Sequence, residues 1–210
     1  MCLGLIAIQF RIVLYKTAFV ATAFAAAVSL FAGTGHLDWY ASAILLERFV
    51  SLTGIILITS VCAPEQDRRV REVIAAKAFS FRKTIVIRLV LSSLICLLII
   101  AVLVCVMSAR GCVFPVCEYL FGAFATAFFI GALGFLIAGI FDNTIAGYFV
   151  SVVYFFMNMM SVPQDSVWYL FSLSGGDNAS KPVLAIAAAT MICVTFFVRA
   201  INARTRFHSS

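Results

Sequence analysis

Apolar runs of about bilayer length follow one another from one end of this chain to the other, and they limit its possible folds to helical membrane domains. Hydrophobic residues make up 64% of the 210 residues and charged residues only 11%, whereas about a quarter of an average soluble domain is charged. A helix that crosses a bilayer needs roughly 20 mainly apolar residues. The sequence therefore predicts an all-α integral membrane protein, a single transmembrane domain with no room for a soluble catalytic domain.

The apolar runs divide into six predicted transmembrane helices, with polar segments between some of them. From the amino terminus we expect an interfacial helix (1–16), spans one and two (17–63), a charged cytosolic helix (64–83), spans three to five (84–162), an external or re-entrant segment (163–181), span six (182–200) and a basic cytosolic tail (201–210). No polar mature domain follows the first apolar run, so we expect that run to remain as an anchor and not to be cleaved as a signal.

The distribution of Lys and Arg predicts the orientation, because these residues favour the cytosolic side when they lie in short loops. With the amino terminus inside, twelve of them fall in cytosolic segments, and three, Arg48, Arg110 and Lys181, fall outside. Both termini and residues 64–83 are therefore predicted to face the cytosol, which requires an even number of spans. We expect a multi-pass protein of the plasma membrane.

Residues 64–83, PEQDRRVREVIAAKAFSFRK, form the only long charged stretch of the chain. Pro64 suits the first position of a helix, and acidic residues directly after it complement the helix dipole. Oppositely charged residues four apart support the helix further; they are Glu65 with Arg69, Asp67 with Arg71, and Arg68 with Glu72. Apolar residues of this segment share one face. The pattern predicts an amphipathic helix lying on the membrane; a solvated loop that only sets topology is the alternative.

With this segment, the chain resembles the membrane subunits of type-two ATP-binding-cassette exporters over nearly its whole length. The resemblance rests on the interfacial helix, the six spans, the charged sequence PEQDRRVREVIAAKAFSFRKTIVIRL, the Gly-rich sequence FFIGALGFLIAGIFDNTIAGY and the broken segment before the last span. It implies a coupling helix at 64–83 that docks on a separate ATPase subunit, and a dimer with a second permease copy or a paralogue. The implied ATPase-facing residues are Glu65, Arg68, Arg69, Arg71 and Glu72.

The sequence offers little for catalysis. The phosphate-binding pattern G-x-x-x-x-G-K-[ST] is absent, and His36 and His208 do not form a zinc-binding H-E-x-x-H helix. We therefore expect no catalytic residue, metal or cofactor in this chain, with ATP and Mg²⁺ bound by the partner ATPase. The net charge of +6 comes from basic residues beside the predicted spans, so it indicates orientation and no nucleic-acid partner.

Three polar residues within the predicted spans are candidates for a functional site: Glu47, Arg48 and Asn158. A charged residue near the centre of a bilayer costs about 2.5 to 3.5 kcal/mol on insertion scales. These side chains either line a substrate route or form structural pairs with neighbouring helices. An exported substrate would be amphipathic or hydrophobic, such as a peptide, drug or lipid. A lipid-modifying or proteolytic membrane enzyme and a non-transporting immunity or accessory protein remain alternatives.

Three further features concern structure. Cys112 and Cys117 share a short external loop, where they are either a disulfide or two thiols. The aromatic segment 163–181 is either a re-entrant helical hairpin or an ordinary external loop. Small residues in the fourth span permit close helix packing; they are Gly131, Gly134, Ala138 and Gly139.

Overall fold

The structure is a computed structural model that describes residues 14–32, 37–65, 81–163, 166–176 and 178–208. Within these ranges every regular element is a helix, which confirms the predicted all-α fold. The elements are α2 (Tyr15–Ala32), α3 (Trp39–Ile44), η2 (Leu45–Val50), α4 (Leu52–Gly54), η3 (Ile55–Thr59), η4 (Ser60–Glu65), α6 (Phe81–Ala109), α7 (Val116–Phe141), α8 (Thr144–Met160), η5 (Ser172–Gly175) and α9 (Ser180–His208).

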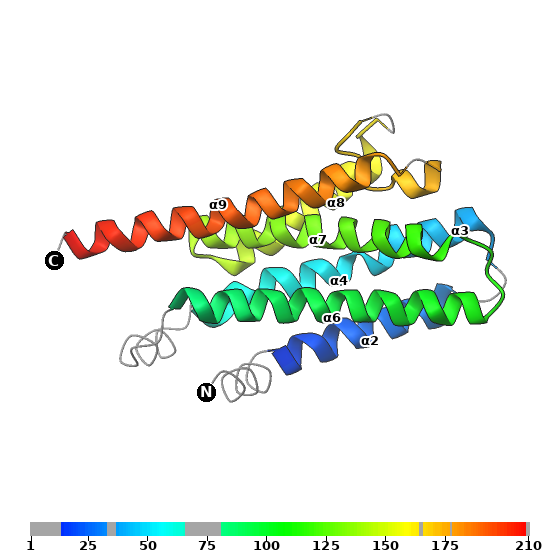
Figure 1. The fold of residues 1–210 in the computed structure, drawn as a ribbon, viewed down its shortest axis with the longest axis horizontal. Coiled ribbons are helices and arrows are strands. Elements are labelled where there is room, and N and C mark those ends of the chain that lie inside the picture. Colours follow the sequence, from blue (N-terminus) through cyan, green and yellow to red (C-terminus); the bar gives the residue numbers. More distant parts are fainter. Residues whose placement is uncertain (1–13, 33–36, 66–80, 164–165, 177, 209–210) are drawn as a thin grey trace.

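The long helices run antiparallel to one another in chain order (Figure 1). Elements α3 to η4 follow one another almost without a break and form one rod, called here the second span (Trp39–Pro64). The start of α2, the end of η4, the start of α6 and the end of α9 lie at one end of the bundle, called here the proximal end. The second span, α7 and α9 all begin at the opposite, distal end.

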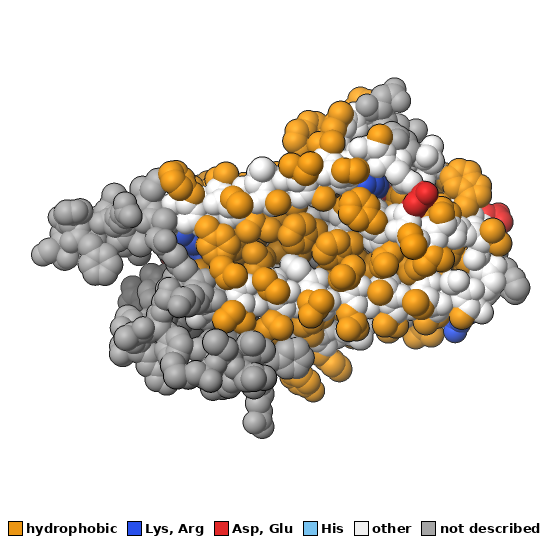
Figure 2. Space-filling model, in the orientation of Figure 1, with side chains coloured by type: hydrophobic (Ala, Val, Ile, Leu, Met, Phe, Trp, Pro, Cys, Tyr) orange, Lys and Arg blue, Asp and Glu red, His pale blue; other side chains and the backbone are white. Residues whose placement is uncertain are grey.

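Four helices of the described chain are long and apolar enough to cross a membrane: Trp39–Pro64, Thr84–Ala109, Val116–Phe141 and Ser180–Arg199. Figure 2 shows hydrophobic side chains over most of the length of the visible face. These features confirm a membrane protein. Two further apolar helices, Tyr15–Phe31 and Thr144–Met160, are shorter, so the number of six spans stays a prediction.

The second span differs from a plain α-helix. Two stretches of it, η2 and η3, are π-helix, and its last turns, η4, are 3₁₀-helix. A π-helix has i→i+5 hydrogen bonds and occurs mostly as short insertions, often at functional sites. Pro64 lies inside η4, near the end of the second span, and not at the start of a new helix as the sequence suggested. The third long helix begins at Phe81, three residues before its predicted start at residue 84.

Close helix packing occurs around α7, as its small residues predicted. A Cβ atom at Gly131 would overlap Ile58 and the carbonyl oxygen of Gly54, and one at Gly134 would overlap the side chain of Thr59. A Cβ at Gly139 would overlap Thr195 of α9, and Ala138 is fully buried. These residues allow the second span and α9 to approach the α7 backbone closely.

A short polar turn joins α7 to α8. Asp142 ends α7 with a left-handed backbone (φ 50°). The side chain of Asn143 then accepts hydrogen bonds from the amides of Ile145, at 2.9 Å, and Ala146, at 3.3 Å. This is the N-cap arrangement that satisfies the first free amides of a helix, so α8 starts directly after the turn.

For two distal loops the sequence left two alternatives open, and the described residues favour one of each. The described part of 163–181 consists of turns, the short 3₁₀-helix η5 and the first two residues of α9, without a helical hairpin. Tyr169 and Phe171 are buried in it, but Trp168 is half exposed. Cys112 and Cys117 are not joined in a disulfide, because Cys112 is turned into the bundle, where its sulfur accepts a hydrogen bond from the Leu37 amide at 3.4 Å.

Several predicted features lie outside the described residues. They are residues 1–13 of the interfacial helix and residues 66–80 of the charged helix, which include Arg68, Arg69, Arg71 and Glu72. Glu65 ends η4, and its side chain is also outside the description. Of the predicted charged helix, the described residues 64–65 belong to η4 and 81–83 to α6.

Candidate functional site

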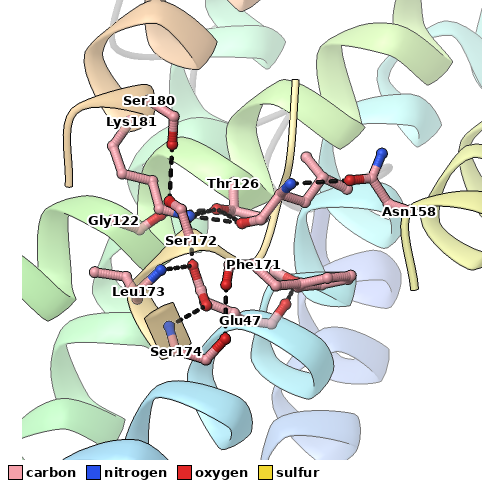
Figure 3. A network of polar contacts seen from close by, with 12 residues as sticks. Glu47, Gly122, Thr126, Asn158, Phe171, Ser172, Leu173, Ser174, Ser180 and Lys181 are labelled. Carbon is pink, nitrogen blue, oxygen red and sulfur yellow. Dashed lines mark hydrogen bonds and ion pairs between the residues drawn. The ribbon is translucent and has the colours of Figure 1, made fainter. Parts of the chain in front are cut away.

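A fully buried ion pair lies near the distal end of the bundle. Glu47 of η2 and Lys181, the second residue of α9, are 0% and 1% exposed, and the ammonium of Lys181 donates to the Glu47 carboxylate. Figure 3 shows Glu47 between Lys181 and the backbone of Leu173 and Ser174. A charge at this depth is tolerated only when it is paired and its other hydrogen-bonding positions are filled, and both conditions are met here.

The Glu47 carboxylate accepts two more hydrogen bonds, both from backbone amides. The amide of Leu173 donates to Oε1 at 3.0 Å and the amide of Ser174 donates to Oε2 at 3.2 Å. Both amides belong to the connection between α8 and α9, in which residues 170–174 are called here the strap. Glu47 therefore joins the second span to a segment more than 120 positions later in the chain.

Lys181 uses its remaining donors on two other elements. Its ammonium donates to the hydroxyl of Thr126 in α7, at 3.0 Å, and to the carbonyl oxygen of Leu170 in the strap, at 2.6 Å. An ammonium group has three donors, so these two bonds and the bond to Glu47 fill its capacity. A single lysine thus connects α9, α7, the second span and the strap.

The strap is held to the bundle by further contacts. Asn158 of α8 accepts a hydrogen bond from the Leu170 amide at 2.9 Å, and the hydroxyl of Ser180 donates to that of Ser172 at 2.8 Å. Leu170 and Phe171 are fully buried. Irregular backbone at membrane depth is stable only where protein covers it, and these contacts provide that cover. A Cβ at Gly122 of α7 would overlap the end of the Leu173 side chain, so a larger residue there would require this leucine to shift.

Arg48 follows Glu47 in the chain and has a different environment. Its guanidinium lies over the ring of Phe171, 5.6 Å from the ring centre, and its side chain is half-buried. Tyr169 is close by: burial raises the pKa of its hydroxyl, and the positive charge of Arg48 opposes that rise. The Nε atom of Arg48 is buried and has no hydrogen-bond partner. Within the described residues, no carboxylate forms an ion pair with Arg48.

The three polar residues predicted from the sequence meet at the strap, but in different roles. Glu47 forms a structural pair, one of the two readings that the sequence left open. Asn158 bonds across elements to the strap backbone, while its amide nitrogen has no partner. Arg48 packs on the strap from the side. The sequence reasoning missed Lys181 and Thr126, because Lys181 was counted as a loop residue before the sixth span.

The arrangement supports positioning and not acid–base chemistry. Both carboxylate oxygens of Glu47 accept hydrogen bonds from fixed donors, so Glu47 is poorly placed to take a proton from a substrate. In the part of the chain that the structure describes, no three His, Cys, Asp or Glu side chains could hold a metal ion together. Comparison of the chain with protein-family models, with curated proteins and with solved structures found no match. Function must therefore be inferred from the residues and their geometry.

Proposed function

We propose that this chain is the permease subunit of an ATP-driven exporter of the type-two ATP-binding-cassette class, and that two permease subunits form a pathway for an amphipathic or hydrophobic substrate. One observation supports this most strongly. The charged segment leaves the bundle at Glu65 and rejoins it at Phe81, and both points lie at the proximal end, beside the start of α2 and the end of α9. A partner that docks there would meet the segment and both terminal regions on one side of the membrane.

The second span would transmit movement of the charged segment into the bundle. It leads directly into that segment at Glu65. Its η3 part packs against α2, α6, α7 and α8, and its η2 part carries Glu47, which holds the strap. In the proposed mechanism, closure of the ATPases at the proximal end shifts the second span, and the strap at the distal end moves with it.

The six-span topology belongs to the same proposal. The shorter helix α8 has 17 residues, which extend about 26 Å at 1.5 Å per residue. This is near the lower limit for a helix that crosses a hydrocarbon core about 30 Å thick. With α2 and α8 as spans, both termini lie on the side of the charged segment. The excess of Lys and Arg there supports a cytosolic position for that side.

No observation favours the two alternative functions. A membrane enzyme would need an available acid or base, and Glu47, the best candidate, is occupied by Lys181 and two amides. A peptide-binding immunity protein would need a polar or charged surface that recognises the peptide, and the large exposed side chains of the described helices are mainly apolar. The permease proposal accounts for the charged segment, which neither alternative uses.

The experiment is co-purification from the native membrane with a tagged chain. We expect the wild-type protein to retain a protein that carries the G-x-x-x-x-G-K-[ST] sequence and hydrolyses ATP, in a fixed ratio to the permease. The triple variant E65Q/R69Q/E72Q should lose it, because these residues are the proposed contacts. The matched control is E118Q, since Glu118 is an exposed acidic residue at the start of α7, on the distal end.

Membrane insertion must be measured in the same samples. We expect cysteine labelling of residues introduced at 66–80 to occur from the cytosolic side in the wild type and in the triple variant alike. Normal retention of the ATPase by the triple variant, or labelling of this segment from outside the cell, would refute the proposal.

A further inference from the structure

The buried charges at the distal end do not balance. Glu47 and Lys181 neutralise each other, and Arg48 adds one positive charge that no described carboxylate compensates. An unpaired cation in an apolar span is costly, yet this one is held in place by Phe171 beneath it. The structure therefore fixes a cation at this position, and among the described residues no carboxylate pairs with it.

The guanidinium of Arg48 keeps unfilled hydrogen-bonding capacity: the hydroxyl of Tyr169 lies close to the group, and its buried Nε has no partner. The Cζ atom of Arg48 lies over the Phe171 ring, and the N–H groups of an arginine point outward in the guanidinium plane, where they fit two oxygens of a phosphate. Arg48 is half-buried and thus still reachable, while Lys181 is 1% exposed and already makes three bonds. Of the two cations, only Arg48 can accept a ligand.

The direction of the helix places this group toward the distal headgroup region. Side chains of an α-helix lean toward its amino terminus, and the second span begins at Trp39 at the distal end. Trp39 and Tyr40 are both half exposed, as is typical of residues at a membrane–water interface. A long arginine side chain that lies below them and leans toward them is able to reach that interface.

We propose that Arg48 binds the phosphate group of an anionic amphiphile, such as a lipid headgroup, at the distal end of the bundle, with Phe171 fixing the guanidinium plane. Basic pockets between transmembrane helices bind anionic headgroups on the cytoplasmic or matrix side of membranes, and Arg48 would provide a single basic group of this kind at the distal end. This site requires no ATPase, so it can be tested separately from the permease proposal and would survive its failure. If the permease proposal holds, the exported substrate is expected to be an anionic amphiphile.

The experiment uses tryptophan quenching by brominated lipids. The chain has two tryptophans, and the substitution W39F leaves Trp168, which is 51% exposed and three residues before Phe171. The protein is reconstituted in phosphatidylcholine vesicles that contain brominated phosphatidylglycerol, and, in parallel, brominated phosphatidylcholine. We expect wild-type Arg48 to favour phosphatidylglycerol by about fivefold, the effect of one basic residue at a membrane surface.

Three variants in this background separate the possible causes. R48M keeps an apolar stem of similar length and should lower the preference to about one, while R48K keeps the charge without the planar fork and should give an intermediate value. R110Q removes another exposed distal arginine and should leave the preference unchanged. Thermal unfolding shows whether each variant is folded. If R48M does not fold, the comparison of R48K with R110Q still tests the proposal.

Inorganic phosphate distinguishes the two sources of the ligand. If the site binds the free anion, phosphate added to vesicles of phosphatidylcholine alone should change the Trp168 emission of the wild type but not of R48M. If phosphate has no effect and the lipid preference is present, the ligand is a lipid headgroup. Equal quenching by the two brominated lipids together with no phosphate effect, or a preference that R48M retains in full, would overturn the proposal.

Discussion

The two rods that flank the charged segment, the second span and α6, differ in burial and in helical regularity. Of the 18 most apolar consecutive residues, 67% are buried in the second span but only 39% in α6. The second span is divided into α-, π- and 3₁₀-helix, whereas α6 is one continuous helix of 29 residues. Both have the length and the hydropathy of a transmembrane helix. Hydropathy therefore identifies a span but does not tell a central rod from a peripheral one.

The polar residues make this distinction. Buried polar side chains occur along the whole second span; they are Ser42, Glu47, Ser51, Thr53, Thr59 and Ser60. In α6 the buried polar side chains are fewer and lie in its first half, at Thr84, Arg88 and Ser92, and exposed apolar residues repeat every four positions, at Val86, Val90, Leu94, Leu98 and Val102. A polar side chain in a membrane needs protein around it, while an apolar one is equally stable against lipid. The difference leads to three predictions about stability.

Breaking the ion pair of the second span should have the largest effect. The substitution K181M leaves the Glu47 carboxylate buried without its cation, and the loss of an ion-pair partner in a protein interior costs about 3 to 5 kcal/mol. The free energy of unfolding is measured in detergent micelles by denaturant titration. The double variant E47Q/K181M should lose less than the sum of the two single variants, by roughly 1 to 3 kcal/mol; additive losses would show that the pair is not coupled.

A methyl group added at Gly54 should have a smaller but clear effect. A Cβ there would overlap the carbonyl group of Ala127 in α7, and overpacking of this kind costs about 1 to 3 kcal/mol. In an ordinary helix the change G54A would instead be favourable by about 1 kcal/mol, so the sign of the effect is diagnostic. G175A is the control, because nothing lies within 4 Å of a Cβ at that position. An unchanged unfolding free energy for G54A would contradict the close packing of the two rods.

Truncation on the exposed row of α6 should have the smallest effect. Val90 and Leu94 are 59% and 57% exposed. Their side chains contact lipid, so V90A and L94A remove few contacts with protein. We expect changes below about 0.5 kcal/mol, as for surface positions in general. The same unfolding titration tests this, and a loss above 1 kcal/mol at either position would mean that protein, such as a second copy, covers this row.

The sequence predicted the features that depend on local composition. Bilayer-length apolar runs predicted the helices. Glu47 and Asn158 stood out because a polar residue in a span always requires an explanation. The π-helical stretches of the second span were not predictable, since they depend on packing against α7 and other helices and not on the residues of the stretch itself.

The partner of Glu47 was missed although a signal was present. A buried carboxylate needs a cation, and only Arg48, Arg110 and Lys181 were predicted on the same side. Arg48 is the next residue in the helix, and consecutive helical residues do not face each other. The choice between Arg110 and Lys181 depended on which loop folds back over the second span, and this tertiary information is absent from the local pattern.

The separation of Glu47 and Lys181 along the chain has a consequence for biogenesis. The glutamate is synthesised 134 residues before the lysine, and at about 5 to 20 residues per second the ribosome needs roughly 7 to 27 s to cover that distance. During this interval the nascent helix carries an acid without its counter-ion. The distal end therefore cannot assemble until α9 emerges from the ribosome, so the last helix completes a structure that the second one began.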